Sequence, residues 1–302
     1  MKLILVAIII FLSAGCADDN DASKTDTKEE LTDHEKNTDQ KQVSDHTYNE
    51  EQVEVEPIEE SAPSYEQLKK TIVEKFENNT PTVWGENIDG VVTEIDTDDK
   101  VIALTFDACD STPDTYDEDL IDFLIEEQIP ATLFINARWI EEYKDDFTDL
   151  ADNPLFEIAN HGYDHKPLSV TGESAYGISG TENPAEVFDE VYKNQQLITE
   201  HTGKSPDYFR SGTAYYDNIA VKIVEFLGLT AVNYNVLGDA GGTFNKDQIV
   251  STFESAQEGS IFLFHMNKPN SDISSGVIEG VQMLIDKGYD FVQLGEYDDH
   301  LK

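Results

Sequence analysis

The sequence predicts a parallel α/β fold whose strands close into a barrel. Short apolar runs rich in β-branched and aromatic residues alternate with longer segments in which apolar residues recur every three or four positions. The alternation continues from about residue 91 to the C-terminus, without a visible internal repeat. Because each strand–helix–strand unit makes a parallel connection, repeating the unit builds a sheet that can curl into a barrel. The hydrophobic fraction of 39% is sufficient for the core of such a domain.

The first expected element is a helix at 65–79, where Leu68, Ile72 and Phe76 recur at helical spacing between two prolines. A pair of strands follows, joined by a polar turn at 96–100. Glycine readily forms the left-handed cap of a helix, so Gly203 is expected to close the longest helix. The strands are expected at 91–95, 101–106, 131–136, 156–161, 208–212, 230–236, 260–266 and 291–297, and the further helices at 119–128, 139–152, 183–203, 218–228, 246–257 and 277–288.

Residues 1–16 have the layout of a secretory signal peptide. One lysine precedes an uninterrupted apolar run that is too short for a good membrane span and ends in small residues. The stretch from Ser13 to Cys16 resembles the lipobox of bacterial lipoproteins, although its leucine, Leu12, lies one position earlier than usual. We therefore expect an extracytoplasmic protein held at the cell membrane by a lipid anchor on Cys16, with simple secretion as the alternative.

Residues 17–64 are expected to form an acidic disordered tether, because they contain few large apolar side chains. Residues 65–90 then form a helix and lead-in, and residues 91–302 form the α/β domain. The whole chain has 62 acidic and 20 basic side chains, a formal net charge of -42. Such a charge excludes a nucleic-acid partner, since phosphate recognition needs a basic surface.

Polar side chains follow five of the expected strands at the point where each strand ends. In a barrel of parallel strands these carboxyl ends share one rim, so the side chains should surround a single pocket. The five residues are Asp107, His161, Arg210, Asp239 and His265.

His161 and His165 are four residues apart and can bind one divalent metal through neutral ring nitrogens. The spacing taken alone is also compatible with two solvated loop histidines. The other motifs favour the metal site.

Five short motifs occur in the order found in the polysaccharide deacetylases, the NodB-homology domains of carbohydrate esterase family four. The sequence from about Val91 to the C-terminus resembles this family, which implies a deformed (β/α) barrel and metal-dependent removal of acetyl groups from a sugar polymer. The motifs are Thr105-Phe106-Asp107, His161 to His165, Phe209-Arg210, Gly238-Asp239 and Leu263-Phe264-His265.

The resemblance also implies a role for each polar residue. Asp107 matches the catalytic base, Arg210 the arginine that keeps this base charged, and His265 the general acid. Asp239 is similar to the carboxylate that supports the acid and base. His161 and His165 match two ligands of a divalent metal, which we expect to be zinc.

The first motif departs from the family pattern, since Ala108 stands where the family has a metal-binding aspartate. A methyl group cannot bind a cation, so either water, Asp110 or Asp114 completes the shell, or the metal is bound weakly. Cys109 is interpreted as a small buried residue in preference to a nucleophile. The third motif lacks its usual proline, and its tyrosines, Tyr215 and Tyr216, are expected to form an aromatic wall. The fourth motif, GDAGG, lacks its second aspartate and its tryptophan.

The leading prediction is therefore an extracytoplasmic metal-dependent hydrolase that deacetylates an N-acetylated glycan, either peptidoglycan or a chitin-like polymer. Peptidoglycan is favoured because a membrane-tethered enzyme meets it first. Two alternatives stay open. One is a carbohydrate-binding lipoprotein that has lost hydrolysis, and the other is a hydrolase of a small amide or imide on the same scaffold.

Overall fold

The computed structural model describes residues 62–109 and 115–302. The expected signal peptide, nearly all of the expected tether, and both Asp110 and Asp114 lie outside these residues. The compact unit that contains the described residues spans Glu60–Lys302. Within the described ranges, no helix combines the length and apolar character needed to cross a bilayer.

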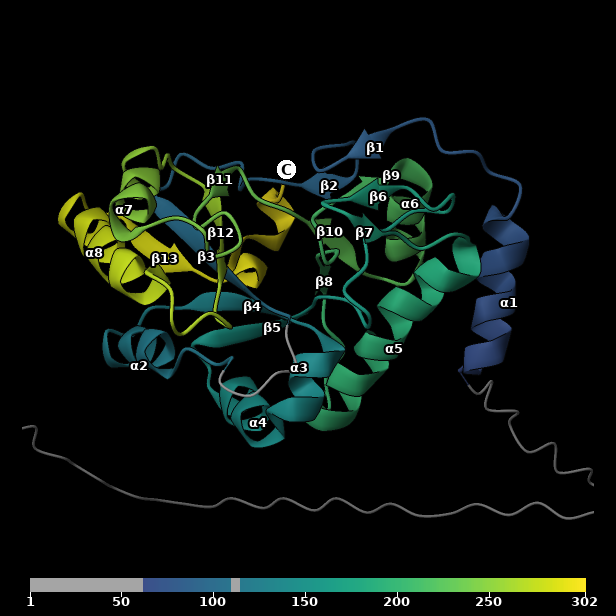
Figure 1. Ribbon diagram of the computed structural model, residues 1–302, viewed down its shortest axis with the longest axis horizontal. Coiled ribbons are helices and arrows are strands. Elements are labelled where there is room, and N and C mark those ends of the chain that lie inside the picture. Colours follow the sequence, from purple (N-terminus) through teal and green to yellow (C-terminus); the bar gives the residue numbers. More distant parts are fainter. Residues whose placement is uncertain (1–61, 110–114) are drawn as a thin grey trace, which may run out of the picture. The chain divides into compact units, whose positions relative to one another are not determined.

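A curled sheet of parallel strands forms the centre of the unit (Figure 1). The strand order is β11-β12-β3-β4-β5-β8-β10-β2, and β13 pairs with the beginning of β3 beside β4. The predicted deformed (β/α) barrel is confirmed. The strands are β2 (Val91–Val92), β3 (Val101–Ala108), β4 (Ala131–Ile135), β5 (Phe156–Asn160), β8 (Tyr208–Phe209), β10 (Thr230–Val232), β11 (Val236–Leu237), β12 (Ser260–His265) and β13 (Asp290–Val292).

Helices cover the outer face of the sheet, with α7 and α8 side by side near β12 and α1 packed on α5 (Figure 1). The two ends of α5 are formed by residues that commonly cap helices. The Asn183 side chain accepts a hydrogen bond from the Glu186 N–H at the start of α5, and Gly203 ends α5 with a φ of 72°. The helices are α1 (Tyr65–Phe76), α2 (Glu118–Glu126), α3 (Ala137–Glu142), α4 (Lys144–Asp152), α5 (Pro184–Thr202), α6 (Asn218–Phe226), α7 (Lys246–Glu254) and α8 (Ile273–Asp286).

Strand β3 is buried on both faces, and its side chains alternate between two apolar clusters. Ile102, Leu104 and Phe106 belong to the cluster that β3 forms with the covering helices, whereas Val101 and Ala103 pack inside the curled sheet. Continuing the alternation places Asp107 on the inner face and Ala108 with the outer cluster. The strand therefore delivers Asp107 to the inside of the barrel.

Some element boundaries differ from the predictions. β2 pairs with β10 and not with β3, so the expected pair of strands at 91–106 is wrong; local alternation does not identify a strand's partner. The final strand ends at Val292, and Leu294–His300 forms a 3₁₀-helix. The expected helix at 139–152 is divided at Tyr143, whose φ and ψ of -114° and 49° are not helical.

Two short pairings were not expected from the sequence. β1 (Trp84–Gly85) pairs with β9 (Tyr216–Asp217), and β6 (Ser174–Ala175) with β7 (Ile178–Ser179). The β6–β7 hairpin lies near the carboxyl ends of the barrel strands and lines a cleft there.

Candidate active site

The carboxyl ends of neighbouring strands bring the polar residues together. β3 and β12 pair in parallel register, so Asp107 lies directly opposite His265. β5 and β8 are likewise neighbours, and His161 and Arg210 are the first residues after them. Four residues that are far apart in sequence therefore meet at one rim, as the strand-end pattern predicted.

Arg210 holds Asp107 in place. Its guanidinium is fully buried, and Nη1 donates a hydrogen bond of 2.7 Å to Asp107 Oδ1. Nε and Nη2 donate to the carbonyl oxygens of Val232 and Asn233 at 3.1 and 2.9 Å. The guanidinium also lies over the Phe134 ring, 4.0 Å from its centroid. The geometry fixes both the position and the charge of the Asp107 carboxylate.

Burial by itself would raise the pKa of the Asp107 carboxyl. The neighbouring His161 ring and the Arg210 guanidinium outweigh this effect and hold the pKa below its usual range. Asp107 is consequently ionised at neutral pH although its side chain is only 5% exposed.

His265 is paired with a second buried carboxylate. Its Nδ1 lies 3.0 Å from Asp239 Oδ1, and its backbone N–H donates to Asp239 Oδ2 at 2.7 Å. Burial lowers the pKa of His265, but the charge and hydrogen bond of Asp239 prevail and raise it above 6.5. With Nδ1 directed at Asp239, Nε2 is the ring atom that can exchange a proton with another group.

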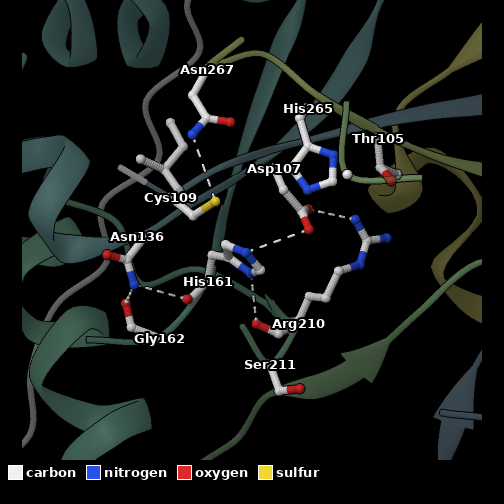
Figure 2. Close-up of polar contacts among 12 residues, drawn as sticks. Thr105, Asp107, Cys109, Asn136, His161, Gly162, Arg210, Ser211, His265 and Asn267 are labelled. Carbon is white, nitrogen blue, oxygen red and sulfur yellow. Dashed lines mark hydrogen bonds and ion pairs between the residues drawn. The ribbon is translucent and has the colours of Figure 1, made fainter. Parts of the chain in front are cut away.

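His161 presents an unpartnered nitrogen to the site. Its Nδ1 lies 3.0 Å from the backbone carbonyl of Arg210 and donates to it, which leaves the lone pair on Nε2. Burial lowers the pKa of His161, so the ring is neutral. Nε2 is buried without a hydrogen-bond partner and faces Asp107 Oδ2 at 3.4 Å (Figure 2). The unpartnered lone pair on Nε2 is therefore available to bind a cation.

His165 approaches His161 through an unusual backbone conformation. Its φ is 59°, in the left-handed region, and its ring centroid lies 5.0 Å from that of His161. Burial lowers the pKa of His165 to about 3, so this imidazole is also neutral. The backbone of His165 packs so closely on Gly212 that a Cβ there would clash with it.

Cys109 is the residue of this site that the sequence reasoning missed. Its Sγ lies with one ring nitrogen each of His161 and His165 in a group whose members are all within 4.8 Å of one another. The side chain is partly exposed, so the interpretation of Cys109 as a small buried residue is wrong. The available signal was the period of two along β3, which turns residues 107 and 109 to the same side.

A cleft of about 390 Å³ leads to Asp107 and His265. Its wall includes Tyr176 of the β6–β7 hairpin, 75% exposed, whose ring meets that of Tyr215 edge to face at 5.6 Å. Tyr216 is fully buried, so its expected place in the aromatic wall is wrong. A larger cleft of about 510 Å³ lies at the amino ends of β5 and β8 and is lined by none of these residues.

Residues 94–232 match the family model described as polysaccharide deacetylase. A curated relative, a bifunctional xylanase/deacetylase from Pseudobutyrivibrio xylanivorans, is 21% identical over 197 residues, which cover 65% of this chain. The chain spans 30% of the length of that relative.

Three solved structures share the fold. A peptidoglycan N-acetylglucosamine deacetylase is 19% identical, with a TM-score of 0.59 and coverage of 69% of this chain and 92% of that chain. A family 4 carbohydrate esterase pseudoenzyme from Bacillus anthracis is 18% identical, with a TM-score of 0.58 and coverage of 76% and 80%. A family 4 acetyl xylan esterase from Clostridium thermocellum, in complex with a cobalt ion, is 19% identical, with a TM-score of 0.52 and coverage of 66% and 90%.

The family match ends at residue 232, before Asp239 and His265, but the parallel pairing of β12 with β3 brings both residues to the same rim as Asp107. Residues 94–232 therefore match the polysaccharide deacetylase family model, and the barrel has the fold of the family 4 carbohydrate esterases.

Proposed function

We propose that the protein is a metal-dependent hydrolase that removes acetyl groups from an N-acetylated glycan, with cell-wall peptidoglycan as the substrate. The observation that carries the proposal is the pair of opposed titratable groups at one cleft. The His161 ring and Arg210 lower the pKa of Asp107, and Asp239 raises the pKa of His265. Amide hydrolysis requires a base and an acid in one site, with environments that shift their pKa values apart.

His161 and His165 would hold the divalent metal, which we propose to be zinc. When bound, the metal would polarise the acetyl carbonyl and lower the pKa of a water molecule. Asp107 accepts the proton of the attacking water at Oδ2, the oxygen that Arg210 does not occupy. His265 donates its Nε2 proton to the departing amine, while Asp239 stabilises the imidazolium until the transfer. The products are acetate and a free amine.

The N-terminal sequence and this site support the proposed substrate and location. A lipid anchor on Cys16 and an acidic tether over 17–64 would place the domain outside the cytoplasm, between the membrane and the wall. One structural relative is a peptidoglycan N-acetylglucosamine deacetylase, which supports the choice of glycan. The highly negative chain is unsuited to a nucleic-acid partner.

A second candidate function is glycan binding without hydrolysis. Ala108 at the position of the family's metal-binding aspartate favours it, and one structural relative is a pseudoenzyme. The buried pair of Asp107 and Arg210 opposes it, because binding a neutral sugar does not require a charged carboxylate held by a buried arginine.

Acetate release from peptidoglycan and chitooligosaccharides, measured with zinc, cobalt or no added metal, tests the proposal. We expect metal-dependent release, reduced by about 10²- to 10⁴-fold in Asp107→Asn, since general-base catalysis typically contributes that factor. The metal content of Asp107→Asn should remain close to that of the unmodified chain, whereas His161→Ala should lose both metal and activity.

Glycan binding without acetate release under any metal would support the second candidate and contradict the first. Turnover of small amides in the absence of glycan deacetylation would instead indicate a different C–N hydrolase. Loss of metal from Asp107→Asn would make Asp107 a ligand and not the base.

A further inference from the structure

We propose that Cys109 supplies, as a thiolate, the third protein ligand of the metal whose other ligands are His161 and His165. The inference rests on the proposed function for the presence of a metal, and it adds the identity of the third ligand and the class of ion. A His₂Cys set favours a thiophilic ion such as zinc over magnesium, calcium or manganese.

The position of Cys109 follows from the strand that precedes it. Asp107 occupies the inner face at the end of β3, and Ala108 turns outward to pack in the core beneath the helices. The next residue returns to the inner side, because successive side chains of an extended backbone alternate. Figure 2 shows the Cys109 sulfur and the His161 ring directed into the same space, next to the Asp107 carboxylate.

The donor set matches a metal centre in kind and spacing. Cys109 Sγ and the nitrogens of His161 and His165 all lie within 4.8 Å of one another. Zinc bonds of about 2.0 to 2.3 Å in a tetrahedral arrangement place ligand atoms about 3.5 Å apart, so small rotamer changes close the site. An independent observation points to a ligand here: the buried His161 Nε2 is aimed into the site and has no hydrogen-bond partner.

The side-chain amide of Asn267 donates a hydrogen bond to the Cys109 sulfur. The backbone N–H of Met266 donates to the Asp107 carbonyl at 3.0 Å, which holds the end of β12 beside the end of β3. The next residue, Asn267, is fully buried, and its Nδ2 donates to Cys109 Sγ at 3.7 Å (Figure 2). A donor to sulfur orients the side chain and stabilises negative charge on it. Binding converts the thiol to a thiolate, and the released proton passes to solvent.

Cobalt(II) and zinc titrations of the full chain test the proposal. Every sample carries Cys16→Ser, so that Cys109 is the remaining cysteine. We expect one cobalt ion per chain and a sulfur-to-cobalt charge-transfer band in the near ultraviolet. Cys109→Ser should remove the band and weaken zinc binding at least about tenfold, as measured by chelator competition. Cys109→Asp should restore much of the affinity without the band. Circular dichroism checks that each variant is folded.

The failures of the two proposals can be distinguished. Cobalt binding without a band, together with unchanged zinc affinity in a folded Cys109→Ser, would overturn the Cys109 ligand while acetate release still supports the proposed function. A band that Cys109→Ser abolishes, in a protein that releases no acetate, would support the ligand and overturn the function. Failure of the unmodified site to bind either metal would overturn both.

Discussion

Arg210 is the residue that holds the Asp107 carboxylate in place. Its guanidinium is fully buried, yet its three hydrogen bonds and the Phe134 ring satisfy it. A lysine could not reproduce this arrangement. Its compact ammonium lacks the planar set of donors with which the guanidinium hydrogen-bonds to one carboxylate and two carbonyl groups. Arg210, which follows a strand three positions away from β3 in the sheet, therefore helps to fix the negative charge of Asp107.

Asp239→Asn should move the pH dependence of catalysis. Asp239 raises the pKa of His265 above 6.5, and a general acid acts only while protonated. Activity should thus persist below this raised pKa and fall as the pH rises through it. Removing the carboxylate lowers the pKa, so the alkaline limb of the kcat/KM profile should shift to lower pH.

Proton NMR titration of the His265 ring gives the same information without turnover. The ring should titrate at lower pH in Asp239→Asn than in the unmodified protein. An unchanged titration would show that Asp239 positions His265 without setting its charge.

At the scale of elements, helix α5 controls the loop that carries His165. Glu190 of α5 is 3% exposed, and its carboxylate accepts hydrogen bonds from the backbone N–H groups of Asp164 and Lys166 at 2.9 and 3.1 Å. Its backbone carbonyl also accepts one from the Tyr163 N–H at 2.9 Å. The left-handed backbone of His165 is held from both sides, by α5 and by Gly212.

Glu190→Gln should flatten the dependence of stability on pH. Burial raises the pKa of Glu190 from 4.5 to about 7, so between these values the folded state keeps a proton that the unfolded state releases. Its stabilising contribution is complete below pH 4.5 and is lost as the pH rises through about 7, by on the order of 3 kcal/mol.

Urea unfolding of both proteins at several pH values measures this effect. The free energy of unfolding should fall less steeply between pH 4.5 and 7 in Glu190→Gln, even though glutamine loses one backbone acceptor and lowers stability overall. Parallel profiles would show that Glu190 does not titrate in this range.

Most element types could be predicted from the sequence, because apolar periodicity reports local burial. The pairing of β2 with β10, and the 3₁₀-helix after β13, could not be predicted in this way. A two-residue strand has too few side chains to show a period, and its partner is chosen by long-range packing. The strand-end pattern also predicted that five of the six motif residues meet at one rim, and the structure places them there. Their catalytic roles stay predictions.

At the scale of the whole molecule, a formal charge of -42 generates strong self-repulsion. The compact state concentrates these charges, so salt that screens them should stabilise the fold. We expect Tm to rise between about 0.02 and about 0.5 M sodium chloride, as the Debye length falls from roughly 20 Å to roughly 4 Å. Potassium chloride should give the same rise. A response to only one of the two salts would indicate ion binding in place of screening.

The sequence by itself determined the alternating α/β barrel and identified six polar residues of the candidate site, because strand periodicity and motif order can be observed in the sequence alone. It misassigned Cys109, since its neighbours along the chain do not include the residues it meets. The approach of Cys109 to His161 and His165 required β3, β4 and β5 to lie side by side in register, and His165 to adopt a left-handed backbone against Gly212. Register and loop conformation arise from packing across the whole domain, so only the tertiary structure decided which side chains could share a metal.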